Sequence, residues 1–246
     1  MFYPYIFIMG MVIASFGLLC AYRIPREESI IKGRSHCDYC RHDLRLYDLI
    51  PVISYISTRG KCRYCGHKLS LIYPLYEVMG GILMVLCFMC YGVDIKAFTS
   101  FVIIMILGVI ALIDYRTMDI YNSTQGALLV AGIIHRLAMG PFSLTSIMLS
   151  AVIVSGFMLI FNRIVNDTFG MGDIEMMAIT GVFLSPSMNI MAMIIGIFSS
   201  GIGYFIKRFI KKDESSHLAF APYLVFGIIV AMFYGERLLS WYLSLF

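Results

Sequence analysis

The chain has 246 residues, of which 60% are hydrophobic and 14% are charged. Soluble domains contain roughly 45–50% apolar and about 25% charged residues, so this composition excludes a soluble globular domain and indicates a membrane protein. The formal net charge of +4 is too small and too unevenly distributed to suggest a nucleic-acid partner.

The first apolar segment runs from Phe2 to Tyr22 with no Lys or Arg before it, and Arg23 and Arg26 follow it closely. A cleaved signal peptide carries its positive charges in front of the apolar region, which is the opposite arrangement. We therefore expect residues 1–22 to form an uncleaved membrane anchor with its N-terminus outside.

The segment from Arg23 to Lys68 is the one sizeable polar part of the chain, and it holds ten of the nineteen Lys and Arg residues. Positive residues accumulate in the cytoplasmic loops of membrane proteins. The sequence therefore predicts a small cytoplasmic domain over residues 23–70.

Two Cys-x-x-Cys pairs lie in this polar segment, Cys37 with Cys40 and Cys62 with Cys65, and 21 residues separate them. Each pair can present two sulfurs to one ion, and two pairs complete a tetrahedron. We expect a structural zinc site, because four protein ligands leave no open position for water. Four free thiols or a redox pair remain the alternative, although the predicted cytoplasmic position argues against structural disulfides.

Other cysteines and histidines have simpler interpretations. His36, His42 and His67 could replace a thiolate ligand, but surface histidines in a polar loop are the simpler interpretation. Cys87 and Cys90 share the Cys-x-x-Cys spacing but lie within an apolar run, so we expect them to pack against other helices or to face lipid.

After the polar segment, apolar runs long enough to form membrane helices recur to the end of the chain. They predict an all-α polytopic membrane protein of about eight transmembrane helices, with the small cytoplasmic zinc module between helices 1 and 2. The spans expected after the first cover residues 71–91, 97–113, 123–139, 144–164, 174–184, 188–206 and 220–246. Gly235-Glu236-Arg237 divides the last run, which is either one span plus an interfacial helix or two short spans. We see no internal repeat.

Threading these spans from an outside N-terminus places sixteen of the nineteen basic residues on the cytoplasmic side, including a cluster at residues 207–212. The third span then ends inside at Asp114, and the sixth begins inside at Asp173. Topology therefore predicts that both carboxyl groups lie at the cytoplasmic face of one membrane.

These two acids are the candidate catalytic residues. Asp114 ends an apolar run, and Asp173 ends the loop Gly170-Met171-Gly172-Asp173 where another run begins. An acid in or near lipid is costly and commonly functional. Two close carboxyl groups share one proton, and such a pair can activate water and protonate a carbonyl oxygen. Two structural alternatives stay open: Asp114 could pair with Arg116, and Asp173 could be an N-cap.

The helix ends bias which acid holds the shared proton. Asp173 stands at a helix start, where the backbone dipole favours the charged form, and Asp114 stands at a helix end, where the effect reverses. We expect Asp173 to be the ionised base and Asp114 to hold the proton. The dipole effect of about 0.3–1 kcal/mol tips this balance without creating it.

Several motifs together resemble the bacterial prepilin peptidases, also called type IV leader peptidases, among the GxGD-type intramembrane aspartic proteases. They follow the family's order and cover nearly the whole chain. Besides both cysteine pairs they are Ala14-Ser15-Phe16, Tyr22-Arg23-Ile24-Pro25, Tyr73-Pro74-Leu75-Tyr76-Glu77, Ala111-Leu112-Ile113-Asp114, Gly170-Met171-Gly172-Asp173 and Phe220-Ala221-Pro222.

The resemblance implies an endopeptidase that cuts the leader of prepilins or pseudopilins after a glycine, at the cytoplasmic face of the bacterial inner membrane. Asp114 and Asp173 match the family's catalytic aspartates, and Gly170 and Gly172 match its site loop. Residues 71–246 would form the transmembrane peptidase domain. The partners implied are these precursors and membrane lipid, with no nucleic acid.

The resemblance also implies a second activity. Family members with the cysteine module commonly methylate the new N-terminus with S-adenosylmethionine, and the four cysteines match the family's zinc ligands. Glu77 and Gly81 are candidates for the methyl-transfer site by position only. The sequence contains no strand, Gly-x-Gly-x-x-Gly loop and helix that would hold a nucleotide.

Two positions depart from the family pattern. Glu175 stands where the family usually has a Lys, and Tyr121-Asn122 stands where it usually has Pro-Asp or Pro-Asn. Asp119 adds a third acid near the site, which we interpret as an exposed loop residue.

Two other classes of function remain open. A transporter would use Asp114 and Asp173 as ion or proton sites, but the inverted repeats common in transporters are not visible. A non-catalytic scaffold of a pilus or competence machine would use the zinc module to bind a partner.

Overall fold

The computed structural model describes residues 2–141, 143–165, 168–210 and 218–245. Within these residues the regular elements are all helical, apart from two isolated β-bridges. The bounds are α1 (Tyr3–Arg23), η1 (Ile24–Arg26), η2 (Leu46–Leu49), α2 (Ile53–Ser57), α3 (Ile72–Tyr91), α4 (Ile95–Thr117), α5 (Asn122–Met139), α6 (Leu144–Ile164), α7 (Met171–Thr180), α8 (Pro186–Phe205), η3 (Ile206–Ile210) and α9 (Ala221–Leu243).

Six helices in the described part of the chain are long and apolar enough to cross a membrane, namely α1, α3, α4, α6, α8 and α9. The protein is therefore a helical, multi-pass membrane protein. α5 does not reach this level, and α7 has ten residues, which at 1.5 Å per residue is about 15 Å, half the thickness of a bilayer core. The predicted count of eight spans stays a prediction.

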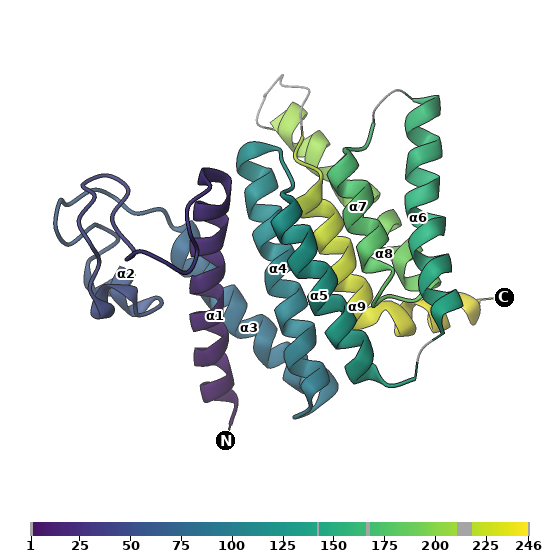
Figure 1. Ribbon diagram of the computed structural model, residues 1–246, viewed down its shortest axis with the longest axis horizontal. Coiled ribbons are helices and arrows are strands. Elements are labelled where there is room, and N and C mark those ends of the chain that lie inside the picture. Colours follow the sequence, from purple (N-terminus) through teal and green to yellow (C-terminus); the bar gives the residue numbers. More distant parts are fainter. Residues whose placement is uncertain (1, 142, 166–167, 211–217, 246) are drawn as a thin grey trace. The chain divides into compact units, whose positions relative to one another are not determined.

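The helix ends lie close to the ends of the predicted apolar runs, because Pro and Gly punctuate them. α8 begins at Pro186 after Ser185, whose hydroxyl accepts the Met188 N–H at 3.4 Å, and α9 begins one residue before Pro222. α9 is continuous through Gly235-Glu236-Arg237, but its C-terminal part turns away from the direction of the rest of the helix (Figure 1), so the choice between one span plus an interfacial helix and two short spans stays a prediction. Lys211 and Lys212 of the predicted basic loop lie outside the described residues.

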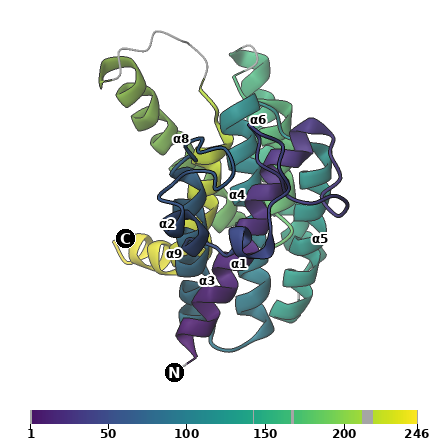
Figure 2. The same ribbon diagram turned by 90° about the vertical axis from the view of Figure 1, so that its left-hand side faces the viewer.

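The chain divides into two compact units, residues 1–101 and 102–246. The domain boundaries expected near residues 22 and 70 stay predictions. In the first unit, α1 packs along α3 (Figure 2). Small residues permit this close approach, because a Cβ atom at Gly10 would lie 2.7 Å from the Gly80 carbonyl oxygen.

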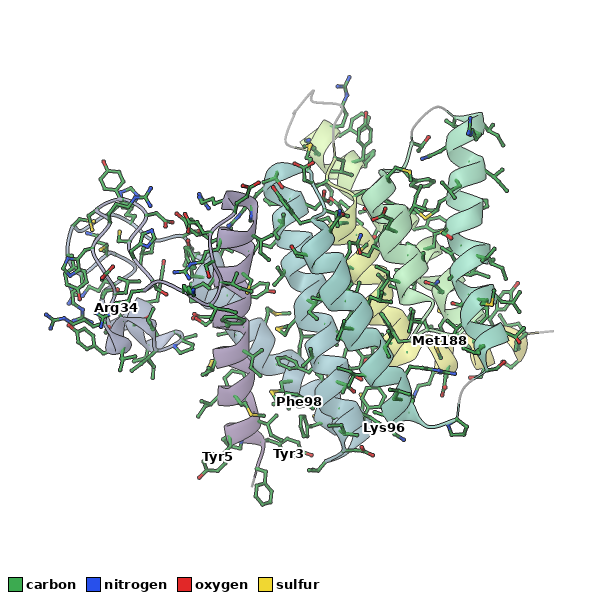
Figure 3. The ribbon with its side chains drawn as sticks, viewed as in Figure 1. Tyr3, Tyr5, Arg34, Lys96, Phe98 and Met188 are labelled. Atoms are coloured by element: carbon green, nitrogen blue, oxygen red, sulfur yellow. The ribbon has the colours of Figure 1, made fainter. Side chains whose placement is uncertain are left out.

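The first unit also contains a loop-rich module between α1 and α3. Figure 3 shows Tyr3 and Tyr5 at the N-terminal end of α1, whereas Arg34 lies on the module that follows the other end of this helix. Arg23 ends α1 and is buried, and its guanidinium donates to the carbonyls of Ser29 at 2.8 Å and Arg34 at 3.0 Å. The last residue of the membrane helix thus anchors the start of the module.

The second unit contains α5 to α9 and most of α4 (Figure 1). α8 packs along α9, and α7 contacts α5, α6, α8 and α9. The core is formed by apolar side chains of all these helices, including Leu107, Leu128, Met158, Met176 and Leu224. The shortest helix of this unit is therefore surrounded by four others, and it carries Asp173 in its first turn.

Candidate active site and metal-binding module

Asp114 lies in the last turn of α4 and is buried, with 6% of its surface exposed. Its Oδ2 accepts the backbone N–H of Ala221 at 2.9 Å. Ala221 is the first residue of α9, so Asp114 pairs one of the N–H groups that a helix start leaves unpaired. Among the described residues the ion pair found is Arg63 with Asp48, so the alternative pairing of Asp114 with Arg116 does not occur.

Asp173 lies in the first turn of α7 and is also buried, with 8% exposed. The N-cap of α7 is Gly170, not Asp173, but the Asp173 carboxyl group interacts with the Gly170 backbone, so it still acts on the helix start. Asp173 and Asp114 interact electrostatically. The Oδ1 of Asp173 is buried and has no hydrogen-bond partner among the described residues. The structure thus brings the two predicted acids together from two different helices of one unit.

The two glycines before Asp173 lie so close to neighbouring atoms that a side chain at either position would meet them. A Cβ atom at Gly172 would lie 2.8 Å from the Cβ of Ile120, in the segment between α4 and α5. A Cβ atom at Gly170 would lie 3.1 Å from the Asp173 Oδ2. A side chain at residue 172 would displace Ile120, and one at residue 170 would require the Asp173 carboxyl group to move by a few tenths of an ångström.

Two amide side chains that the sequence analysis missed hold the segment before α7. Gln125 donates from Nε2 to the Gly172 carbonyl at 2.7 Å. Asn162 on α6 both donates to the Phe169 carbonyl and accepts the Phe169 N–H, each at 2.8 Å. The sequence contained a signal for both residues, because polar side chains within apolar helices are uncommon and tend to be functional.

Two further acids, Glu175 and Asp119, lie close in sequence to the candidate residues, and Glu175 departs from the family pattern. Glu175 and Asp119 are exposed. Asp119 interacts electrostatically with Asp114, and it lines a cavity of about 450 Å³ with Ile120, Tyr121 and the next two residues of the chain. The interpretation of Asp119 as an exposed loop residue is confirmed.

The four predicted cysteine ligands come together in the first unit. The Sγ atoms of Cys37, Cys40, Cys62 and Cys65 all lie within 4.8 Å of one another, which is a spacing that could hold a metal ion. All four are free thiols, so they form no disulfide. A cluster of four thiols fits the tetrahedral sulfur coordination of zinc.

The cluster is built from two similar turns. In each turn the backbone N–H of the first cysteine bonds to a histidine carbonyl, from Cys37 to His42 at 3.0 Å and from Cys62 to His67 at 2.8 Å. The sequences Cys-Asp-Tyr-Cys-Arg-His-Asp-Leu and Cys-Arg-Tyr-Cys-Gly-His-Lys-Leu repeat after 25 residues. The expectation of no internal repeat is therefore wrong for this short motif.

The histidines of the two turns stack on tyrosines of the opposite turn. Tyr39 stacks on His67 with ring centroids 4.2 Å apart, and His42 packs on Tyr64 at 3.7 Å. These contacts give both rings a packing role, and the set of ligand atoms found contains no histidine among the described residues.

The four thiols of the cluster differ in how readily they ionise. Burial opposes ionisation of Cys62, but backbone N–H groups of Cys65 and Tyr64 and the neighbouring thiols outweigh it and lower the pKa of Cys62 to about 7. Burial raises the pKa of Cys37. A bound divalent cation favours the thiolate form of its cysteine ligands, so the cluster has one thiol already poised to ionise.

The two candidates for methyl transfer have contacts within the first unit. Glu77 on α3 is buried and accepts the Val52 N–H at 2.8 Å. A Cβ atom at Gly81 would lie 2.6 Å from the ring of Phe7 on α1. Each residue therefore has a packing or anchoring role, and their part in methyl transfer stays a prediction.

Cys87 on the same helix is buried, whereas Cys90 is exposed.

Comparison with protein-family models gives two matches. Residues 8–91 match the bacterial peptidase A24 N-terminal domain, and residues 101–206 match the type IV leader peptidase family. The second match contains the segment from α4 to α8 and hence both Asp114 and Asp173.

Curated relatives match over nearly the full chain. A prepilin leader peptidase/N-methyltransferase of Bacillus subtilis (strain 168) is 30% identical over 98% of this chain and 97% of its own length. Proteins with the same name from Neisseria gonorrhoeae and Aeromonas hydrophila are 28% and 24% identical, and this chain covers 94% and 77% of their lengths. No solved structure matches the chain significantly.

Proposed function

The chain belongs to the type IV leader peptidase family, and from this we propose that it is a membrane aspartic endopeptidase acting on type IV prepilins or pilin-like precursors. The observation that carries the proposal is the electrostatic interaction of two buried carboxyl groups, Asp114 and Asp173, from separate helices of one unit. Close carboxyl groups share a proton, which is the chemistry of aspartic proteases.

The proposed reaction uses one ionised and one protonated acid. The ionised carboxylate takes a proton from water as the oxygen attacks the carbonyl carbon of the glycine, while the other acid gives its proton to that carbonyl oxygen. Collapse of the tetrahedral intermediate then breaks the C–N bond, and the departing nitrogen takes up a proton. Because the α9 amide bonds to Asp114, the α4 and α7 dipoles alone do not decide which acid starts ionised.

A second step is proposed from the names of the relatives, which include N-methyltransferase. The new N-terminal amine would take a methyl group from S-adenosylmethionine. Glu77 and Gly81 stay candidate residues for this step.

We propose a zinc ion in the four-cysteine cluster. Four thiolates would fill its tetrahedral coordination, so the zinc would stabilise the module and leave no position for a reacting water. Residues 23–70 would then form a cytoplasmic zinc domain between a membrane anchor, residues 1–22, and a peptidase domain, residues 71–246.

The proposed topology has eight spans with the N-terminus outside, in the bacterial inner membrane. The distribution of basic residues supports it. The shorter helices α5 and α7 would be the fourth and sixth spans, and both catalytic acids would lie at the cytoplasmic face.

The decisive experiment is incubation of the purified protein with a precursor pilin, followed by mass spectrometry of the product. Loss of the leader tests the peptidase, and a further 14 Da mass increase with S-adenosylmethionine tests the methyltransferase. Asp114→Asn and Asp173→Asn should each abolish cleavage. A wild-type protein that binds the precursor without cutting it would favour the scaffold, and proton-coupled transport lost in both variants would favour the transporter.

A further inference from the structure

Gln125 lies in the first turn of α5, where its backbone N–H bonds to the Tyr121 carbonyl at 3.1 Å. Its side chain is 5% exposed. The side-chain Nε2 donates to the carbonyl of Gly172 at 2.7 Å, which joins the start of α5 to the start of α7. Gly172 directly precedes Asp173 in the chain.

The oxygen of the Gln125 side-chain amide has an unusual environment. A carbonyl oxygen only accepts hydrogen bonds, so the group that faces Gly172 must be the nitrogen. The Oε1 of Gln125 therefore points elsewhere, and it is buried without a hydrogen-bond partner among the described residues. A buried acceptor without a partner destabilises a protein, whereas an apolar side chain of the same shape would avoid this loss.

A residue kept for stability alone would not leave half of its amide unpaired. Resting on the proposed peptidase function, we propose that Gln125 is a positioning residue, which holds the Gly172 carbonyl and thereby sets the direction of the Asp173 carboxyl group toward Asp114. The Asp173 Oδ1 is likewise buried and unpaired among the described residues, so the carboxyl group is held on one side only, where it interacts with the Gly170 backbone.

The contacts of Gly172 explain why such a brace is effective. On one side Gly172 lies against Ile120, so close that a Cβ atom would come within 2.8 Å. On another side the Gln125 amide bonds its carbonyl. Removing the amide frees one of these two restraints on the residue next to the catalytic acid.

The first test replaces Gln125 with methionine, which has a similar shape and no polar group. We expect Gln125→Met to be as stable as the wild type or more stable, by thermal unfolding in detergent. We expect its kcat for precursor cleavage to fall roughly 100-fold, the loss that a misplacement of about 1 Å causes, with KM changed less than about threefold. Leu129→Met on the exposed side of α5 is the matched control.

The second test is Gln125→Glu, because a neutral glutamic acid can donate to the Gly172 carbonyl and an ionised one cannot. The ratio of variant to wild-type kcat should therefore rise as pH falls, while the ratio for Gln125→Met should stay flat. The titratable groups around this site are Asp114, Asp119, Asp173 and Glu175, with His135 farther along α5. All are present in every protein compared, and Gln125→Met, which adds no titrating group, gives the baseline against which the Gln125→Glu ratio is compared.

The outcomes separate this inference from the proposed function. If the wild type does not cleave the precursor, the peptidase proposal itself fails. If the wild type cleaves and Gln125→Met has normal kcat, or loses kcat only in proportion to a loss of folded protein, the positioning role is wrong. A kcat ratio of Gln125→Glu that does not change with pH would also overturn it.

Discussion

Gly172 shows how a single residue position can limit what the site tolerates. Its backbone packs on Ile120, and its carbonyl accepts from Gln125. Gly170, two residues earlier, leaves space for the Asp173 carboxyl group. Neither glycine has a positive φ, so the requirement is for space and not for backbone freedom.

We expect Gly172→Ala to lower cleavage by roughly 10- to 100-fold, because a methyl group would push the first turn of α7 away from Ile120 and displace Asp173. The matched control is Gly126→Ala, since a Cβ atom at Gly126 meets nothing within 4 Å. That control should keep full activity and gain about 0.5–1 kcal/mol in stability from the better helix propensity of Ala. Equal activity of the two variants would contradict the role given to Gly172.

The site could be predicted from the sequence to the extent that it depends on local patterns. Asp114 and Asp173 stand at the ends of apolar runs, so their helix positions followed directly. The Ala221 amide that bonds Asp114 and the Gln125 amide that bonds Gly172 come from segments 107 and 47 residues away. Such contacts depend on which helices are neighbours, and one sequence does not contain that information.

At the scale of elements, a buried polar network joins α6, α7 and α8. Asn189 on α8 donates to the carbonyls of Ser150 and Met177, each at 3.1 Å, and accepts from the Thr180 hydroxyl at 2.8 Å. Ser150 also donates to the Leu184 carbonyl at 3.0 Å. The network fixes the turn between α7 and α8 and thus the far end of the helix that begins near Asp173.

Asn189→Leu should destabilise the protein by about 1–3 kcal/mol for each buried group that it leaves unpaired. Thermal unfolding in detergent measures this loss. Ser200→Ala, a half-buried position on the same helix whose hydroxyl bonds to the Ile197 carbonyl one turn earlier, is the control and should unfold close to the wild-type temperature. An unchanged unfolding temperature of Asn189→Leu would show that the network does not hold α7.

The helices themselves could be predicted well because a membrane helix is a continuous apolar run between polar or breaking residues. α9 shows the limit of this approach. Gly235-Glu236-Arg237 was expected to divide it, and the helix is continuous there because a single Gly and two charged residues with good helix propensity weaken a helix without ending it, although its C-terminal part turns aside (Figure 1).

At the scale of the whole molecule, the four-cysteine cluster predicts that each chain binds one metal ion. Native mass spectrometry should find one zinc ion per chain in the wild type. Cys62→Ser should lose the ion, because three thiolates bind zinc more weakly than four. Cys90→Ser changes an exposed cysteine of α3 outside the cluster and should retain the ion. Zinc retained by Cys62→Ser would place the ion elsewhere.

The topology gives a further expectation for the whole chain. A reporter that is active only outside the membrane should work when fused at Asp94, between α3 and α4, and fail when fused at Asp119, between α4 and α5. The reverse result would place both candidate catalytic acids on the outer face and overturn the proposed site of cleavage.

The shortness of α7 has a consequence for how the enzyme meets lipid. A helix of ten residues cannot match the acyl chains on both sides of a bilayer, but four neighbouring helices surround it and receive its buried side chains. The depth of the Asp173 carboxyl group is therefore set by protein contacts and not by hydrophobic mismatch. Thinner or thicker bilayers would therefore act on the acid pair through α4, the long helix that carries Asp114, and not through α7.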